Sequence, residues 1–123
     1  MKASELMIGD WVLDGGVNAQ VTSITCDGNI ETTKRMSNEE IVEPIPLKRI
    51  HLTKNGFSAA NAEDNEFVYR DGYEVKVMIE ENLVDAIFLS IEFAERNIWK
   101  EIKYVHELQQ AMRIMGCDKM IEL

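Results

Sequence analysis

Aspartate-glycine pairs divide this chain into short segments and constrain its fold more than any other sequence feature. Asp14-Gly15, Asp27-Gly28 and Asp71-Gly72 each separate runs that are rich in β-branched and aromatic residues. Such pairs are strong signals for two-residue hairpin turns. The sequence therefore predicts antiparallel hairpins, with strands over residues 11–13, 17–25, 30–33, 67–70, 73–79 and 86–93.

The segments between these strands are predicted from proline, glycine and polar residues. Residues 34–40 are mostly polar and predict a loop, whereas Pro44 and Pro46 make residues 41–47 an edge strand or an extended connector. Residues 47–55 predict a short helix that Gly56 caps. The small polar residues 58–65 predict a loop or a boundary between two lobes.

The C-terminal part changes to a helical pattern. Residues 98–102 fit a fourth strand of the second half, although Asn97 could equally cap a longer helix. From about residue 103 the apolar residues Val105, Leu108, Met112 and Met115 form one helical stripe, which Gly116 ends. Residues 121–123 could add a short final strand. The helix is expected to cover the strand face that holds Val75, Val77, Leu89 and Ile91.

Composition indicates a globular protein with an uneven charge. The 123 residues carry a net charge of −9. Residues 1–62 hold six Lys/Arg and eight Asp/Glu (−2), and residues 63–123 hold seven and fourteen (−7). An acidic surface repels a phosphate backbone, so the first half is the better place for nucleic acid to bind. No apolar run is long enough for a membrane span or a secretion signal, and we expect a cytoplasmic protein with Cys26 and Cys117 reduced.

One fragment resembles a zinc-protease motif. His106-Glu107 gives the first two letters of H-E-x-x-H, which needs a second His four residues later so that both rings face one ion. That position is Gln110, and the only other histidine is His51. We therefore expect no metal, and we interpret His106 as a partly exposed or capping residue near a helix start.

Other catalytic patterns and cofactor motifs are missing. The chain has no G-x-S-x-G, no glycine-rich phosphate loop and no Cys near a His in sequence. Its acidic clusters lack the spacing of a calcium loop and predict a solvated surface. We therefore predict no catalytic residues and no cofactor.

Several residues remain as candidates for contacts with a partner. Trp11, Trp99 and His106 are the candidates for protein contact, because aromatic side chains in small β domains often lie in the core or on a contact rim. If nucleic acid bound through the N-terminal lobe, five basic residues would be the contacts, provided that they converge on one face, namely Lys34, Arg35, Lys48, Arg49 and Lys54.

Motifs along nearly the whole chain carry a resemblance. The order ELxIGDWV, VTSI, EPIPL, NGF, DGY, FLSI and YVHELQ resembles an uncharacterised family of short proteins from Bacteroides-type gut bacteria and their phages and prophages. The resemblance implies a cytoplasmic or phage-associated setting and transfers no catalytic residue. More loosely, IGDWV followed by VTSI looks like the opening of SH3-like small barrels, which bind peptides or nucleic acids through their loops.

We predict an α+β fold. An SH3-like β lobe over residues 1–46 precedes an α-β-β-β-(β)-α lobe over residues 47–123, packed as one compact unit. The leading functional hypothesis is a non-enzymatic interaction protein of a phage or mobile element that binds a host or phage protein, in an oligomeric state left open and without a membrane partner. The alternatives are a nucleic-acid-binding module, an acidic DNA mimic built on Glu63, Asp64, Glu66, Glu80, Glu81 and Asp85, and an enzyme of unrecognised type.

Overall fold

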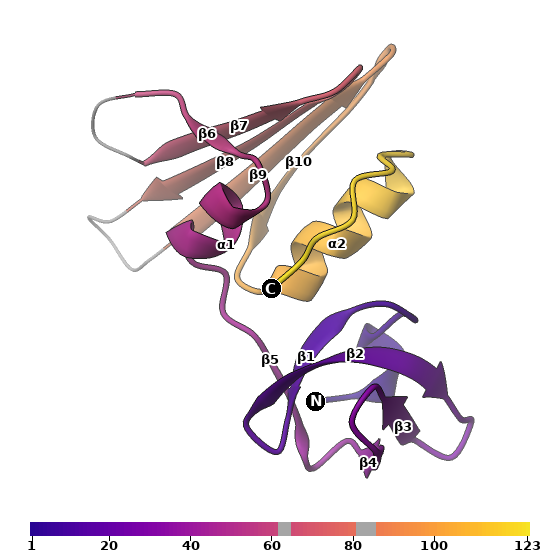
Figure 1. Ribbon diagram of the computed structural model, residues 1–123. Coiled ribbons are helices and arrows are strands. Elements are labelled where there is room, and N and C mark those ends of the chain that lie inside the picture. Colours follow the sequence, from indigo (N-terminus) through magenta and orange to yellow (C-terminus); the bar gives the residue numbers. More distant parts are fainter. Residues whose placement is uncertain (62–64, 81–85) are drawn as a thin grey trace. The chain divides into compact units, whose positions relative to one another are not determined.

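The chain folds into two compact units of antiparallel sheet and helix. The computed structural model describes residues 1–61, 65–80 and 86–123. Unit 1 comprises Met1–Pro46, Tyr104–His106 and Leu123, and unit 2 comprises Leu47–Lys103 and Glu107–Glu122. Both sheets are antiparallel, and the helices lie outside them (Figure 1). The predicted α+β class is confirmed at this level.

Unit 1 is a five-stranded sheet preceded by one turn of 3₁₀ helix. Its elements are η1 (Ala3–Glu5), β1 (Trp11–Asp14), β2 (Val17–Ile24), β3 (Asn29–Thr32), β4 (Met36–Asn38) and β5 (Val42–Pro44). The strand order is β4-β3-β2-β1-β5. Gly15 and Gly16 adopt φ values of 62° and 84°, the backbone that a two-residue type I′ turn requires. The predicted β1–β2 hairpin is therefore confirmed.

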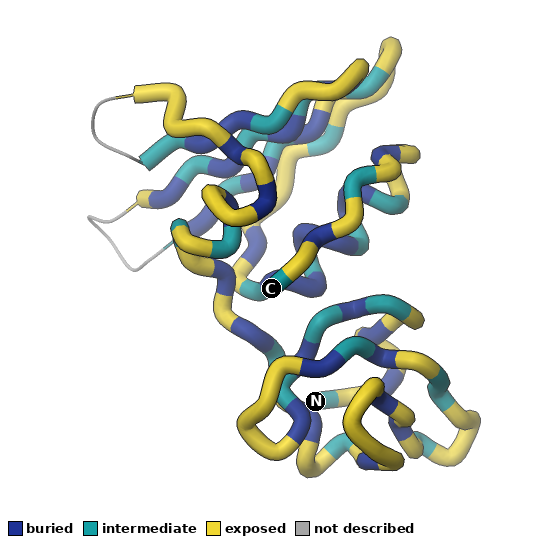
Figure 2. Tube along the Cα trace, in the orientation of Figure 1, coloured by how far each residue is buried: buried dark blue, intermediate teal, exposed yellow. Residues whose placement is uncertain are grey.

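The core of unit 1 follows the alternation of its strands. Val12, Val21, Ile30 and Val42 are completely or almost completely buried, and each comes from a different strand. Ala3 and Leu6 close the cluster from the η1 side. The burial is drawn in Figure 2 as dark blue segments.

Two sequence predictions in unit 1 need comment. The expected loop at residues 34–40 contains β4, whose Met36, Ser37 and Asn38 pair with β3, so the loop prediction was wrong there. The polar composition of this segment suggested a loop. Ser37 can nevertheless lie buried in a strand, because its hydroxyl donates a hydrogen bond inside the unit. The segment after it behaves as predicted, since β5 is the last strand of the sheet and, among the described residues, pairs with β1 alone.

Unit 2 is a five-stranded meander with two helices. Its elements are α1 (Arg49–Lys54), β6 (Ser58–Ala59), β7 (Glu66–Arg70), β8 (Glu74–Glu80), β9 (Ala86–Phe93), β10 (Arg96–Ile102) and α2 (Val105–Ile114), although the first residues of α2 belong to unit 1. The strand order is β10-β9-β8-β7-β6. Of the two alternatives for residues 98–102, the strand is confirmed.

Details of the connections differ from the predictions. The expected loop at 58–65 begins with β6, which pairs with β7. The β7–β8 connection spans three residues, because Arg70 pairs with Glu74, and of its residues only Gly72 has a positive φ. The last residues, 121–123, form no strand.

The core of unit 2 lies on one face of its sheet, the inner face. Val75, Val77, Leu89 and Ile91 are fully buried there. Leu108 and Met112 on α2, and Met115 just after it, are also buried. A Cβ atom added at Gly116, just after α2, would lie 3.6 Å from the Phe93 ring on this face. Figure 1 shows α2 alongside the sheet. No helix in the described part of the chain is long and apolar enough to span a bilayer.

Two stretches of chain far apart in sequence meet beside Pro46. Within unit 1, Pro46 forms an isolated antiparallel bridge with Tyr104, and the Val105 N–H donates to the Ile45 carbonyl at 2.9 Å. Within unit 2, the Leu47 N–H donates to the Lys103 carbonyl, also at 2.9 Å. Unit 1 is therefore completed by residues that come from the far end of the chain.

The β9–β10 turn contains a backbone conformation that alanine adopts reluctantly. Ala94 and Glu95 form a two-residue turn between the paired Phe93 and Arg96, and Ala94 has a φ of 57°. We expect Ala94→Gly to raise the free energy of unfolding by ~0.5–1 kcal/mol, because glycine has no Cβ to clash there. Urea unfolding measures this change. Gly72→Ala, which places a Cβ at a φ of 74°, should instead destabilise the protein.

Candidate functional site

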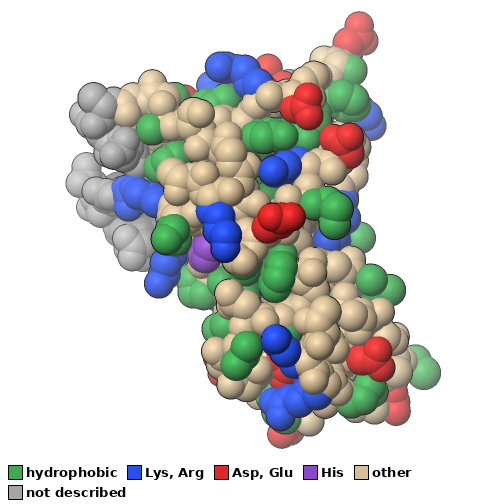
Figure 3. All heavy atoms as spheres, in the orientation of Figure 1, with side chains coloured by type: hydrophobic (Ala, Val, Ile, Leu, Met, Phe, Trp, Pro, Cys, Tyr) green, Lys and Arg blue, Asp and Glu red, His purple; other side chains and the backbone are tan. Residues whose placement is uncertain are grey.

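The basic residues that the sequence singled out belong to both units. Lys34 and Arg35 follow β3 in unit 1, whereas Lys48, Arg49 and Lys54 lie at α1 in unit 2. Figure 3 shows Lys and Arg side chains on the face that carries α1. The N-terminal lobe thus contains only two of the five proposed nucleic-acid contacts.

The basic residues at α1 act on His51. Its Nδ1 accepts a hydrogen bond of 3.0 Å from the Lys48 N–H. Burial lowers the pKa of His51, and the charges of Lys48 and Lys54 lower it further. The lowered pKa favours the neutral ring, and α1 adds the fully buried Leu52 to the core as well as its surface charges.

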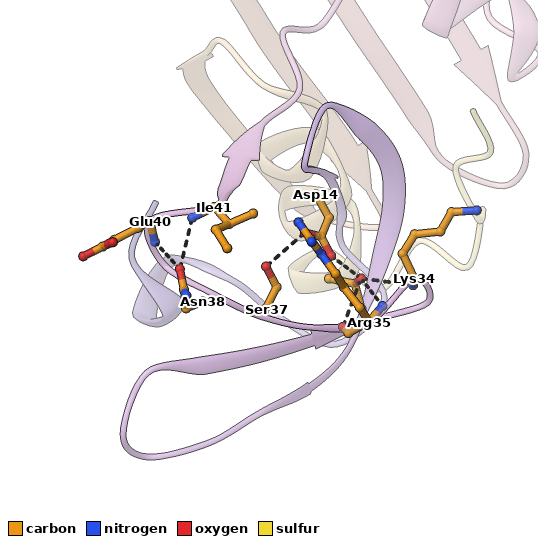
Figure 4. Close-up of polar contacts among 8 residues, drawn as sticks. Asp14, Lys34, Arg35, Ser37, Asn38, Glu40 and Ile41 are labelled. Atoms are coloured by element: carbon orange, nitrogen blue, oxygen red, sulfur yellow. Dashed lines mark hydrogen bonds and ion pairs between the residues drawn. The ribbon is translucent and has the colours of Figure 1, made fainter.

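A buried carboxylate organises the polar end of unit 1 (Figure 4). Asp14 ends β1 and accepts hydrogen bonds from the hydroxyls of Thr32 at 2.7 Å and Ser37 at 3.0 Å. Arg35 adds its Nε at 3.1 Å and its Nη2 at 3.0 Å. Burial raises the pKa of Asp14, but the hydrogen bonds from Thr32, Arg35 and Ser37 outweigh it and hold the pKa below its usual value.

This network also fixes the backbone of the neighbouring loops. The Lys34 N–H donates to the Thr32 hydroxyl at 3.1 Å, and the Asn38 Oδ1 accepts from the N–H groups of Glu40 and Ile41. The Arg35 side chain is 50% exposed, but its guanidinium is engaged by Asp14. The cluster in Figure 4 is therefore a clamp on the β3–β4 loop and the turn after β4.

The structure corrects the interpretation of His106. Its ring stacks on Tyr104 at 5.7 Å between centroids, and the residue is only 5% exposed. The expectation of a partly exposed residue was wrong, because the helical stripe is wider than Val105, Leu108, Met112 and Met115 and also buries His106 and Gln109. His106 thus offers no surface for a partner. Among the described residues no three His, Cys, Asp or Glu side chains could hold a metal ion together.

The two tryptophans have different surroundings. Trp11 is half-buried on β1, opposite Gln20. Trp99 lies on β10 and is 60% exposed. Its indole stacks on the ring of Phe88 with centroids 5.9 Å apart and an interplanar angle of 14°. Of the three aromatic candidates for protein contact, Trp99 is therefore the exposed one.

Trp99 and Phe88 lie on the sheet face opposite the core of unit 2. Met78 pairs with Phe88, Phe88 with Glu101, and Trp99 with Ser90, so these side chains share one face. Phe88 and Met78 are half-buried and Trp99 is exposed. We call Met78, Phe88 and Trp99 the aromatic platform and this side of the sheet the outer face.

Carboxylates surround the aromatic platform. The outer face also carries Glu66, Glu74, Glu92 and Glu101, against the basic side chains of Arg70 and Lys76. Arg70 contacts Glu74 at 2.9 Å, and Lys76 contacts Glu66 at 3.7 Å and Glu74 at 3.6 Å. For Glu92 and Glu101 the described residues supply no ion pair. The platform thus lies in a net negative surface.

Sequence reasoning named Trp99 but missed its stacking on Phe88, although a signal was present. Alternation placed Phe88 on the polar side of its strand, which is an unusual position for a large aromatic residue. Of the six carboxylates of the proposed DNA mimic, four lie outside the described residues, namely Glu63, Asp64, Glu81 and Asp85. The other two, Glu66 and Glu80, lie on the outer face.

Comparison of the chain with known protein families, curated proteins and solved structures gave no match.

Proposed function

We propose that this chain is a non-enzymatic interaction protein of phage or mobile-element origin that binds another protein in the cytoplasm. The observation that carries the proposal is the exposed Trp99, stacked flat on Phe88 on the outer face. Exposed tryptophans that extend a partly buried apolar surface are typical anchors of protein interfaces. The proposed phage setting rests on the sequence resemblance alone.

The surrounding charge favours a protein over a nucleic acid. Aromatic side chains on a sheet also stack nucleotide bases, but such surfaces combine the rings with Lys and Arg for the phosphates. Here Glu92 and Glu101 border the rings, and the two basic residues of this face are already paired with carboxylates. We infer that a phosphate backbone would be repelled from the aromatic platform.

Unit 1 is proposed to be an SH3-like small barrel. Its long β2 pairs with β1 at one end and with β3 at the other, and the register shifts between Val21 and Ser23. A bulge of this kind lets one strand serve two parts of a bent sheet. The strand order and this bulge support the proposal.

Removing Trp99 tests the proposed function. We expect wild-type protein to retain a specific protein from host lysate, identified by mass spectrometry and confirmed with purified components. Trp99→Ala should weaken that direct binding at least ~30-fold, since tryptophan anchors contribute ~2 kcal/mol or more. Stability should fall by no more than ~1.5 kcal/mol, the contribution of one stacked aromatic pair.

Met120→Ala is the matched control, because Met120 is an exposed apolar side chain outside the sheet. It should leave binding unchanged. Equal binding by wild type and Trp99→Ala would refute the proposal. Salt-sensitive binding of a single-stranded oligonucleotide that Trp99→Ala abolishes would favour the nucleic-acid function instead.

A further inference from the structure

The two edge strands of the unit 2 sheet differ in how much backbone they expose. The edge strand β6 has two residues, whereas the edge strand β10 has seven residues and pairs with β9 without interruption. In the described part of the chain no strand pairs with the other side of β10. Natural edge strands are usually shortened, bulged, interrupted by proline or given charged side chains, and of these devices β10 has only the charges of Arg96, Lys100 and Glu101.

The hairpin turn determines which groups of β10 point outward. A two-residue turn makes Phe93 and Arg96 a hydrogen-bonded pair, and such pairs alternate along an antiparallel ladder. Arg96, Ile98, Lys100 and Ile102 therefore direct their backbone N–H and C=O groups toward β9. The corresponding groups of Asn97, Trp99 and Glu101 point away from the sheet, and their side chains lie on the outer face.

We propose that β10 accepts an extended, lysine- or arginine-rich segment of the partner protein as a sixth strand of this sheet. The proposal rests on the proposed function, because the same Trp99 supplies both the aromatic anchor and one outward backbone pair. Strand addition of this kind draws affinity from main-chain hydrogen bonds and specificity from alternate side chains. Every second side chain of the added strand would lie on the outer face beside Trp99.

Charge identifies the occupant. Glu101 lies on β10 itself, and Glu92 lies on the neighbouring β9 opposite Asn97. A basic side chain of the added strand directly across from or diagonal to Glu101 stabilises the strand pair, and an acidic one destabilises it. Glu92 lies one strand further away and adds longer-range negative charge to the same face. A second copy of this chain would bring the same carboxylates and a net charge of −9 to the contact. A basic segment of another protein fits better.

A synthetic peptide of the length of β10, seven residues, with Lys and Val alternating provides the probe. We expect it to change the fluorescence of Trp99 in a Trp11→Phe background. It should also slow amide hydrogen exchange at least ~10-fold at Asn97, Trp99 and Glu101, because these N–H groups become hydrogen-bonded. The same peptide with Glu in place of Lys should bind at least ~10-fold more weakly.

Asn97→Pro separates strand pairing from the aromatic anchor. It removes one outward N–H without touching the charges or Trp99, and proline is tolerated on the free side of an edge strand. We expect it to weaken binding of the Lys peptide at least ~10-fold, while Asn97→Ala, the matched control, binds like wild type.

Several outcomes would overturn the inference. One is no binding of the Lys peptide, and another is binding that leaves the three amides unprotected. Unchanged affinity of Asn97→Pro for the Lys peptide would also exclude strand pairing. If Trp99→Ala still abolished binding of the partner protein in that case, the proposed function would stand although the strand-addition inference had failed. Protection of the same amides in the free protein, together with a dimer in sedimentation, would assign the edge to a second copy.

Discussion

Asp14→Ala is expected to lower the free energy of unfolding of unit 1 by about 2–4 kcal/mol, because it leaves buried donors without their acceptor. Thr32 and Ser37 are buried, and both donate to this carboxylate. Arg35 contributes less to the loss, since its half-exposed guanidinium can be hydrated instead. Urea unfolding followed by Trp11 fluorescence in a Trp99→Phe background reports on unit 1 alone.

The same carboxylate makes stability depend on pH. The pKa of Asp14 in the folded protein lies below 3.8, its ordinary value and the one expected in the unfolded chain. The ionised form therefore stabilises the fold above that value, and the stabilisation is lost as pH falls through the folded pKa. We expect wild type to lose stability below about pH 4 and Asp14→Asn to show a shallower dependence there.

Asp27→Asn is the matched control for both measurements. Asp27 is fully exposed, and its pKa is lowered by the hydroxyl of Thr25. Its replacement should leave the stability close to that of wild type. If Asp14→Ala behaved like Asp27→Asn, the clamp in Figure 4 would have no energetic importance.

Leu108→Ala should have the largest effect in unit 2, a loss of about 3–5 kcal/mol. Leu108 is 1% exposed in the middle of the α2 stripe, so the substitution removes apolar contacts and leaves a cavity. Urea unfolding followed by far-ultraviolet circular dichroism measures the loss.

Ile114→Ala tests whether burial, rather than helix propensity, causes that effect. Ile114 lies on the same helix and is 72% exposed. We expect this variant to differ from wild type by less than ~0.5 kcal/mol, because alanine favours a helix and little apolar area is lost. Equal losses in the two variants would contradict the assignment of Leu108 to the core.

Periodicity predicted the regular part of this fold well. The faces of β8 and β9 follow directly from the alternation of Val75, Val77, Leu89 and Ile91, because both strands are buried on one side only. The glycine turns were equally informative at Gly15-Gly16. At Asp71-Gly72 the hairpin was predicted correctly but its length was not, since only one of the two residues has a positive φ.

The failures arise where tertiary contacts override local composition. Residues 36–38 look like a loop, yet Ser37 is held in a strand by the buried Asp14, which lies 23 positions earlier. His106 looks like a surface residue, yet its ring stacks on Tyr104 inside unit 1. The aromatic platform depends on the register of β9 against β10, and a single sequence does not reveal that pairing.

The bridge between Pro46 and Tyr104 has a consequence for the time at which unit 1 can form during synthesis. Its strands leave the ribosome early, but Val105, whose N–H binds the Ile45 carbonyl, follows about 60 residues later. At roughly 5–20 residues per second, the interval is about 3–12 s. During it the edge beside Pro46 lacks its native neighbour, so we expect the N-terminal strands to reach their final state only after nearly all of unit 2 has been synthesised.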